Sequence, residues 1–139
     1  MSRAPAPARA LVGTPGIPVL LVDSVSSLGP GDAGLVVVSG SHGGASAGAL
    51  ARGRRLAAVF FNDAGVGKDG AGVVALAALE EEATPAGAVD YRSARIGDAR
   101  DCWEEGVLSH VNAAARRAGL APGDALRQAV LQAFGRRAR

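Results

Sequence analysis

The chain has 139 residues, of which 48% are hydrophobic and 20% are charged, so it is long enough for one globular domain with its own core. No stretch approaches the roughly 18 consecutive apolar residues of a membrane span, so we expect no membrane partner. The formal net charge is +2, but five of the 15 basic residues lie near the chain ends, where they leave a middle with more acidic than basic residues. A basic face that follows phosphates, and with it nucleic-acid binding, is therefore not expected.

The chain ends differ in composition from the middle. Residues 1–16 are rich in proline and alanine and contain no apolar run of signal-peptide length, which predicts a flexible tail rather than a targeting segment. Residues 136–139 are expected to form a basic C-terminal tail, and residues 17–135 a single domain. Cys102 is the only cysteine and cannot form an internal disulfide. Together with the expected lack of an export signal, this predicts a cytoplasmic protein.

From residue 19 onward, short apolar runs alternate with helical patterns. The predicted elements, in chain order, are strands at 19–22 and 35–38, a helix at 45–52, a strand at 56–61, a helix at 72–82, a strand at 88–91, and helices at 101–118 and 125–134. The middle strands are continuous runs rich in valine and phenylalanine, typical of strands covered on both faces. The helix at 101–118 is the longest, because Trp103, Val107, Val111 and Ala115 recur at every fourth residue.

This alternation predicts an α/β fold, as a small three-layer sandwich around a mostly parallel four-stranded sheet, similar to Rossmann and flavodoxin-like domains. Only about a dozen residues separate the first two strands, near the lower limit for a parallel crossover. Either the first strand is an antiparallel edge, or the link contains a single helical turn that begins near Ser24. A thin core and the apolar stripe of the helix at 101–118 also predict a homo-oligomer.

Ligands bind such sheets beyond the carboxyl ends of the strands. Three polar, glycine-rich segments follow predicted strands, at 39–46, 62–70 and 93–98, and we expect them to converge on one site that accepts an anion. The residues expected to bind the ligand are Ser39, Ser41, Gly43, Gly44, Asn62, Gly65, Gly67, Asp69, Ser93, Arg95 and Asp98.

Three residues of these segments are candidates for catalysis. His42 directly follows a strand, and a histidine at a loop tip can accept a proton near neutral pH. Asp63, at the end of the neighbouring strand, is the expected partner that orients it, with Asp69 and Asp98 as alternatives. Lys68 adds a positive charge beside glycine amides that can face a carboxylate, a single phosphate or a developing oxyanion.

Several known motifs are incomplete in these segments. Gly67 and Lys68 follow a strand, but Asn62 and Asp69 stand where a phosphate-binding loop needs glycine and a hydroxyl. The dinucleotide fingerprint and paired metal ligands are also missing, so we expect no cofactor and no metal. A strand followed by Ser-His-Gly resembles the caspase-like cysteine peptidases, but the next strand runs into Asn62 and Asp63 with no cysteine, which excludes peptidase activity.

Two residues of the predicted helix at 101–118 carry separate expectations. His110 would lie nine residues beyond Asp101, about 14 Å along the helix axis and too far from the strand ends to share the site. Cys102 would lie near the helix N-terminus, where a lowered thiol pKa is the alternative to a packing role.

The lead hypothesis is an enzyme that performs proton transfer or hydrolysis on a small carboxylate- or amide-bearing metabolite, as a hydrolase or a lyase or isomerase. The alternative is a non-catalytic ligand-binding or regulatory subunit of a larger enzyme. An enzyme requires His42 within hydrogen-bond reach of Asp63 and a closed pocket around them.

Overall fold

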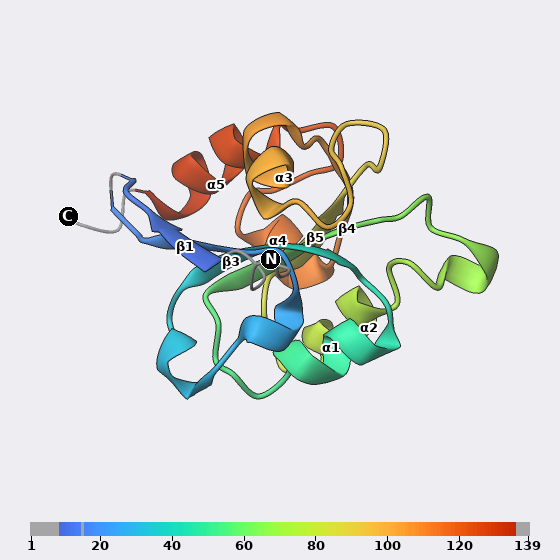
Figure 1. Ribbon diagram of the computed structural model, residues 1–139, viewed down its shortest axis with the longest axis horizontal. Coiled ribbons are helices and arrows are strands. Elements are labelled where there is room, and N and C mark those ends of the chain that lie inside the picture. Colours follow the sequence, from blue (N-terminus) through green and yellow to red (C-terminus); the bar gives the residue numbers. More distant parts are fainter. Residues whose placement is uncertain (1–8, 15, 136–139) are drawn as a thin grey trace, which may run out of the picture.

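The computed structural model describes residues 9–14 and 16–135, and it shows an α/β fold with five helices and a mixed six-stranded sheet (Figure 1). The predicted α/β class is confirmed. The strands are β1 (Arg9–Val12), β2 (Val19–Val22), β3 (Val36–His42), β4 (Ala58–Asn62), β5 (Ala86–Val89) and β6 (Leu108–Val111). They lie side by side in chain order, with β2 to β5 parallel and both edge strands antiparallel to their neighbours.

The sheet differs from the prediction at both edges. The predicted four strands correspond to β2 to β5, and the sheet has six strands because β1 and β6 extend it. Residues 9–12, expected in the tail, form β1, whereas residues 1–8 and 136–139 lie outside the described residues. The strand at 19–22 is paired in parallel with β3, so the antiparallel-edge alternative is wrong. The other alternative agrees in part: Ser24 caps the helical turn η1 (Val25–Ser27) in the link, but a second 3₁₀ turn, η2 (Pro30–Asp32), follows it.

Helices cover both faces of the sheet (Figure 1). On one face, α1 (Ala45–Ala51) and α2 (Ala75–Glu80) pack with the 3₁₀ turn η1 on strand residues such as Val37, Val59 and Phe61. On the opposite face, α3 (Ala99–Glu105) and α5 (Leu126–Phe134) pack on Val36, Val38 and Phe60. Alternate strand residues thus enter opposite halves of the core, as the two-residue period of a strand requires.

The strand order distinguishes this sheet from the two predicted arrangements. In Rossmann and flavodoxin-like sheets the spatial order of the strands reverses near the first strand. In this sheet the strands lie in chain order from β1 to β6, without such a reversal. The connections nevertheless cross to different faces of the sheet: β4 leads to α2 on one face, and β5 leads to α3 on the other. The loops that follow β4 and β5 therefore diverge, as at the points where open sheets bind ligands.

The single helix predicted at 101–118 is wrong. In its place the chain forms α3, then β6, then α4 (Ala113–Arg117). Gly106 ends α3 close against β5, since a Cβ there would lie 2.8 Å from Cγ1 of Val89 and 2.3 Å from the Cys102 carbonyl oxygen. The apolar residues spaced by four thus belong to different elements, and the helical stripe on which the homo-oligomer prediction depended does not exist.

Candidate functional site

The carboxyl ends of the parallel strands and the start of β6 meet at one edge of the sheet, which we call the rim. Each strand from β2 onward brings a polar residue to it: Asp23, His42, Asp63, Asp90 and Ser109. The sequence pattern predicts His42 and Asp63 at such an edge. Asp23 and Asp90 are not among the predicted site residues, although Asp23 follows its strand just as Asp63 does. Ser109 is predicted within a helix.

A groove of about 380 Å³ lies over the ends of β2 and β3, and we call it the rim groove. Its lining comes from four segments of the chain. The lining residues are Asp23, Ser24, Val25, Gly40, Ser41, His42, Ser46, Ala47, Leu50, Ile96 and Gly97. Leu50 and Ile96 line this groove and are 38% and 48% exposed, so its walls include two large hydrophobic side chains in contact with solvent.

The close approach of two glycines brings the first and third predicted segments together in this groove. The amide of Gly97 donates to the carbonyl of Gly40 at 2.7 Å, and a Cβ on Gly40 would lie 2.5 Å from the carbonyl carbon of Gly97. Nearby, Asp23 Oδ1 accepts a hydrogen bond of 3.0 Å from the amide of Ala99, which fixes the start of α3 to the end of β2.

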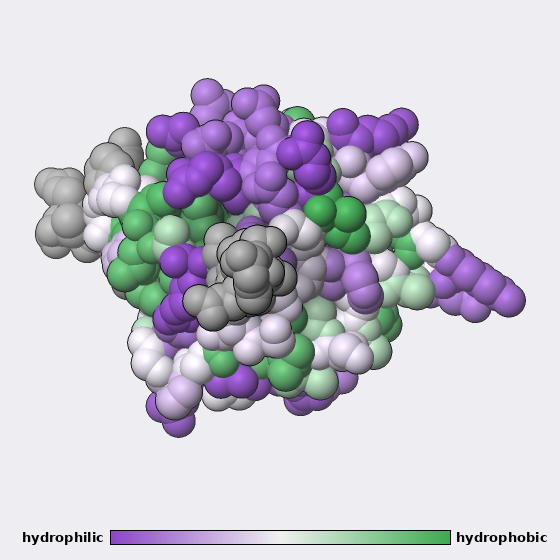
Figure 2. All heavy atoms as spheres, viewed as in Figure 1, coloured by the Kyte–Doolittle hydropathy of each residue, from purple (hydrophilic) through white to green (hydrophobic). Residues whose placement is uncertain are grey.

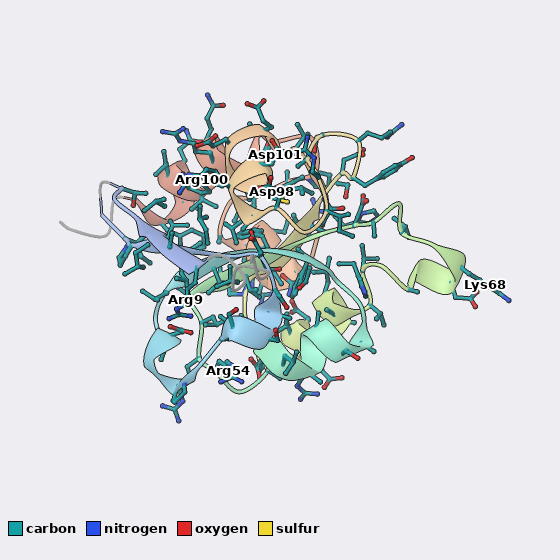
Figure 3. The ribbon with its side chains drawn as sticks, in the orientation of Figure 1. Arg9, Arg54, Lys68, Asp98, Arg100 and Asp101 are labelled. Atoms are coloured by element: carbon teal, nitrogen blue, oxygen red, sulfur yellow. The ribbon has the colours of Figure 1, made fainter. Side chains whose placement is uncertain are left out.

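A second hollow of about 340 Å³ lies on the other side of Ile96 and Gly97 and also includes Asp23. Arg95, Asp98 and Arg100 line this α3 hollow, and Figure 3 shows Asp98 and Arg100 on the α3 side of the sheet. Arg95 is 3.6 Å from Asp98, and Asp98 Oδ1 caps α3 by accepting from the Asp101 amide at 2.9 Å. The two predicted ligand residues therefore pair with each other beside the rim groove rather than in it.

Besides Asp23 and Ser24, the polar side chains of the rim groove are Ser41, His42 and Ser46. Ser41 Oγ accepts from the Val25 amide at 3.0 Å, so its own proton is left for another acceptor. The His42 ring lies over Gly44, where a Cβ would approach Cε1 to 2.6 Å. Within residues 9–14 and 16–135, the exposed His42 side chain makes no hydrogen bond or ion pair, and Ser46 is exposed on the first turn of α1.

The expected hydrogen bond between His42 and Asp63 does not form. Asp63 is only 4% exposed, and its Oδ1 accepts from the amides of Gly65 and Tyr91 at 2.8 and 3.0 Å. Its Oδ2 accepts from the hydroxyl of Ser109 at 2.7 Å. All these partners lie in the loop after β4, after β5 or on β6, away from His42, so Asp63 cannot orient that ring.

The second predicted segment leaves the rim. Residues 64–73 form a projecting arm with the turn η3 (Lys68–Gly70) at its end, and Lys68 points into solvent (Figures 1 and 3). The end of the arm is hydrophilic and stands away from the body of the molecule (Figure 2). Gly67, Lys68 and Asp69 are exposed on it, so these residues do not join the groove that His42 lines.

The remaining predicted ligand residues have structural roles. Asn62 is buried and donates to the Ala94 carbonyl at 3.0 Å, while its Oδ1 accepts from the Ala64 amide at 2.9 Å. Ser39 is also buried, and its hydroxyl accepts from the Ser41 amide. Ser93 Oγ connects the Asp90 carbonyl to the Val107 amide. Gly43 packs against the arm, where a Cβ would lie 2.8 Å from the Gly72 carbonyl oxygen.

Cys102 is buried, and this burial raises the pKa of its thiol to about 11, which is opposite to the thiolate alternative. Among the described residues, no three His, Cys, Asp or Glu side chains form a group that could hold a metal ion. None of the helices in the described part of the chain is long and apolar enough to cross a membrane.

Comparison of the chain with protein-family models, with curated proteins and with solved structures found no match. A proposal for the function therefore depends on the geometry of the rim.

Proposed function

We propose that this protein binds a small molecule in the rim groove. The observation that supports this proposal is the joining of two distant segments, at Gly40 and Gly97, into a hollow that combines hydrogen-bonding groups with exposed apolar walls. Its volume of about 380 Å³ falls in the range of small-molecule sites, and a few polar groups among apolar walls are the usual composition of such sites.

The ligand we propose is an amide-bearing molecule with a compact apolar body. Ser41, His42 and Ser46 offer groups that can donate and accept, which suits an amide because it does both. A carboxylate is less suited, since Asp23 forms part of the wall and the cation expected to hold it, Lys68, lies at the end of the arm. The apolar body would pack against Val25, Leu50 and Ile96.

A binding role is favoured over proton transfer in this groove. The catalytic hypothesis needs a second group that orients His42 and a site closed to water. Asp63 hydrogen-bonds to other partners, and Ser46 and Leu50 stand on an exposed wall. The proposed function is therefore that of a ligand-binding or regulatory domain.

Three probes with one apolar body test this proposal: cyclohexanecarboxamide, cyclohexanecarboxylate and cyclohexylmethylamine. We expect the carboxamide to bind most tightly when binding is measured by NMR titration of the backbone amides, with shifts at Ser41, Ser46 and Gly97. Ser46→Phe should fill the groove and weaken binding about tenfold or more, a loss of about 1.4 kcal/mol.

Ala49→Phe is the matched control, because Ala49 is exposed on the same helix and does not line the groove. It should leave the affinity unchanged. Equal affinity of the Ser46→Phe and Ala49→Phe proteins, or no shift at the groove with any of the three probes, would contradict the proposed function.

A further inference from the structure

Three side chains form a continuous hydrogen-bonded series at the opposite end of the rim from the groove. Ser109 Oγ is 2.7 Å from Asp63 Oδ2, and His110 Nδ1 is 2.9 Å from the same Ser109 oxygen. Asp63 comes from the end of β4, whereas the other two residues are neighbours on the edge strand β6. The series lies where the loops after β4 and β5 diverge to opposite faces of the sheet.

The positions of the protons in this series follow from its geometry. Asp63 accepts from two backbone amides and from Ser109, as a carboxylate does, and a contact of 2.7 Å between Oγ and Oδ2 requires a proton between them. Ser109 has only one hydroxyl proton, which this contact uses. Its oxygen must therefore accept the second hydrogen bond, and His110 Nδ1 must donate it. The neutral imidazole then carries its proton on Nδ1 and a lone pair on Nε2.

The series is held from several directions. The amides of Gly65 and Tyr91 fix Asp63 Oδ1, and the Ser109 hydroxyl also lies 3.3 Å from the Ala88 carbonyl. Beside it, Arg92 pairs with Asp90 at 2.8 Å. His110 is half-buried, so part of the residue remains in contact with solvent.

We propose that His110 is a reactive histidine whose Nε2 acts as a nucleophile toward small acyl compounds, with Asp63 and Ser109 as positioning residues. In the arrangement of a carboxylate, a hydroxyl and an imidazole, the negative charge of Asp63 stabilises the positive charge that develops on the ring when Nε2 attacks. The proposal does not depend on a ligand in the rim groove, since neither Ser109 nor His110 lines it.

With p-nitrophenyl acetate as the probe, the proposed reaction has two steps. The Nε2 lone pair forms a bond to the ester carbonyl carbon, and the bond to p-nitrophenolate breaks. Water then attacks the carbonyl carbon of the acetyl group, the bond between that carbon and Nε2 breaks, and Nε2 recovers its lone pair. One ester and one water give acetate, p-nitrophenolate and two protons, without an oxidant or a metal.

The first test is the tautomer of His110, measured through the ¹⁵N chemical shifts of its ring. We expect a protonated Nδ1 and an unprotonated Nε2 in the neutral ring. Ser109→Ala should restore the Nε2-protonated form that free imidazole side chains favour, and Ser109→Thr should preserve the original tautomer because it keeps the hydroxyl. A purely structural role of Ser109 would not move the proton between nitrogens, so an unchanged tautomer in Ser109→Ala overturns the positioning role.

The second test is the steady-state release of p-nitrophenolate, recorded after any stoichiometric acetylation of amines is complete. His110→Gln should lower the protein-dependent rate about tenfold or more, and Ser109→Ala should lower it with partial recovery in Ser109→Thr. Arg116→Gln, an exposed change on α4, serves as the control of unchanged rate. A rate lost in His42→Gln but not in His110→Gln overturns the proposal, and so does a wild-type rate no greater than that of the buffer.

Discussion

At the scale of single residues, an ion pair between Asp32 and Arg9 links the start of the sheet to the β2–β3 connection. Asp32 is only 3% exposed, and its two oxygens accept from the Arg9 guanidinium at 2.6 and 3.1 Å. Asp32 also accepts from the Gly29 amide at 2.8 Å. The hydrogen bonds from Arg9 are the main cause that lowers the pKa of Asp32, and burial acts in the opposite direction.

This pair predicts a pH dependence of stability. Because the pKa of Asp32 is lower in the folded state than in the unfolded chain, its ionised form stabilises the fold above the unfolded value of about 3.9. That contribution is lost as the pH falls through the folded-state pKa. Asp32→Asn should therefore lower the free energy of unfolding by about 1–3 kcal/mol at pH 7, and the difference from wild type should shrink below about pH 4.

Urea unfolding of both proteins at pH 7, 5 and 3 measures this difference. Asp69→Asn is the control, because Asp69 is exposed at the end of the arm and should leave stability nearly unchanged. If the wild type and Asp32→Asn differ by the same amount at pH 3 and pH 7, ionisation of Asp32 does not contribute as proposed.

Some residues of the rim are predictable from local sequence, and others are not. Ser41 and His42 are predictable because they come three and four residues after the apolar run 35–38, so their place near a strand end depends on local sequence alone. The partners of Asp63 could not be found, because Ser109 reaches it only through the pairing of β6 with β5. A contact between residues 46 positions apart leaves no local pattern.

At the scale of elements, the contact between Gly40 and Gly97 holds the loop before α3 on the end of β3. Gly40→Ala would place a Cβ at 2.5 Å from the Gly97 carbonyl carbon, so the loop must move away from the strand. We expect the free energy of unfolding to fall by about 1–3 kcal/mol, the usual effect of overpacking. The carboxamide probe should also lose affinity, because the loop carries Ile96 and Gly97 into the rim groove.

Gly31→Ala is the matched substitution for this test. A Cβ on Gly31 would meet nothing within 4 Å, so this change should affect neither urea unfolding nor probe binding. An equal response of the Gly31→Ala and Gly40→Ala proteins would show that the close approach of the two loops does not hold the groove in place.

Elements were predictable where the sequence pattern and the tertiary contacts agree. The strand at 19–22 is reproduced in full as β2, and the helices at 45–52 and 125–134 correspond to α1 and α5 within one residue at each end. At 101–118 the two disagree. Trp103 and Ala115 are both buried against the same core, which imitates a helical period, but Val107 between them is exposed and Gly106 turns the chain into a strand.

At the scale of the whole molecule, β1 closes one edge of the sheet although the sequence predicts a tail there. Its RALV sequence has only two large apolar residues, and Leu11 is 63% exposed, so composition did not reveal it. All four residues of β2 are nevertheless buried, because β1 pairs with them along their full length and their side chains pack in the core on both faces of the sheet.

Removal of residues 1–12 should therefore destabilise the fold, relative to a protein that lacks only residues 1–8. Four cross-strand pairs disappear, which corresponds to about 1–4 kcal/mol, and Asp32 also loses its pairing with Arg9. The protein without residues 1–12 should unfold at a lower urea concentration than the full chain with Arg9→Ala, since Arg9→Ala removes the ion pair but keeps the strand. The exposed edge of β2 should also make the protein without residues 1–12 associate with increasing concentration, as measured by light scattering. If the proteins without residues 1–8 and 1–12 unfold at the same urea concentration, β1 does not stabilise the sheet, and the interpretation of residues 9–12 as part of a tail is restored.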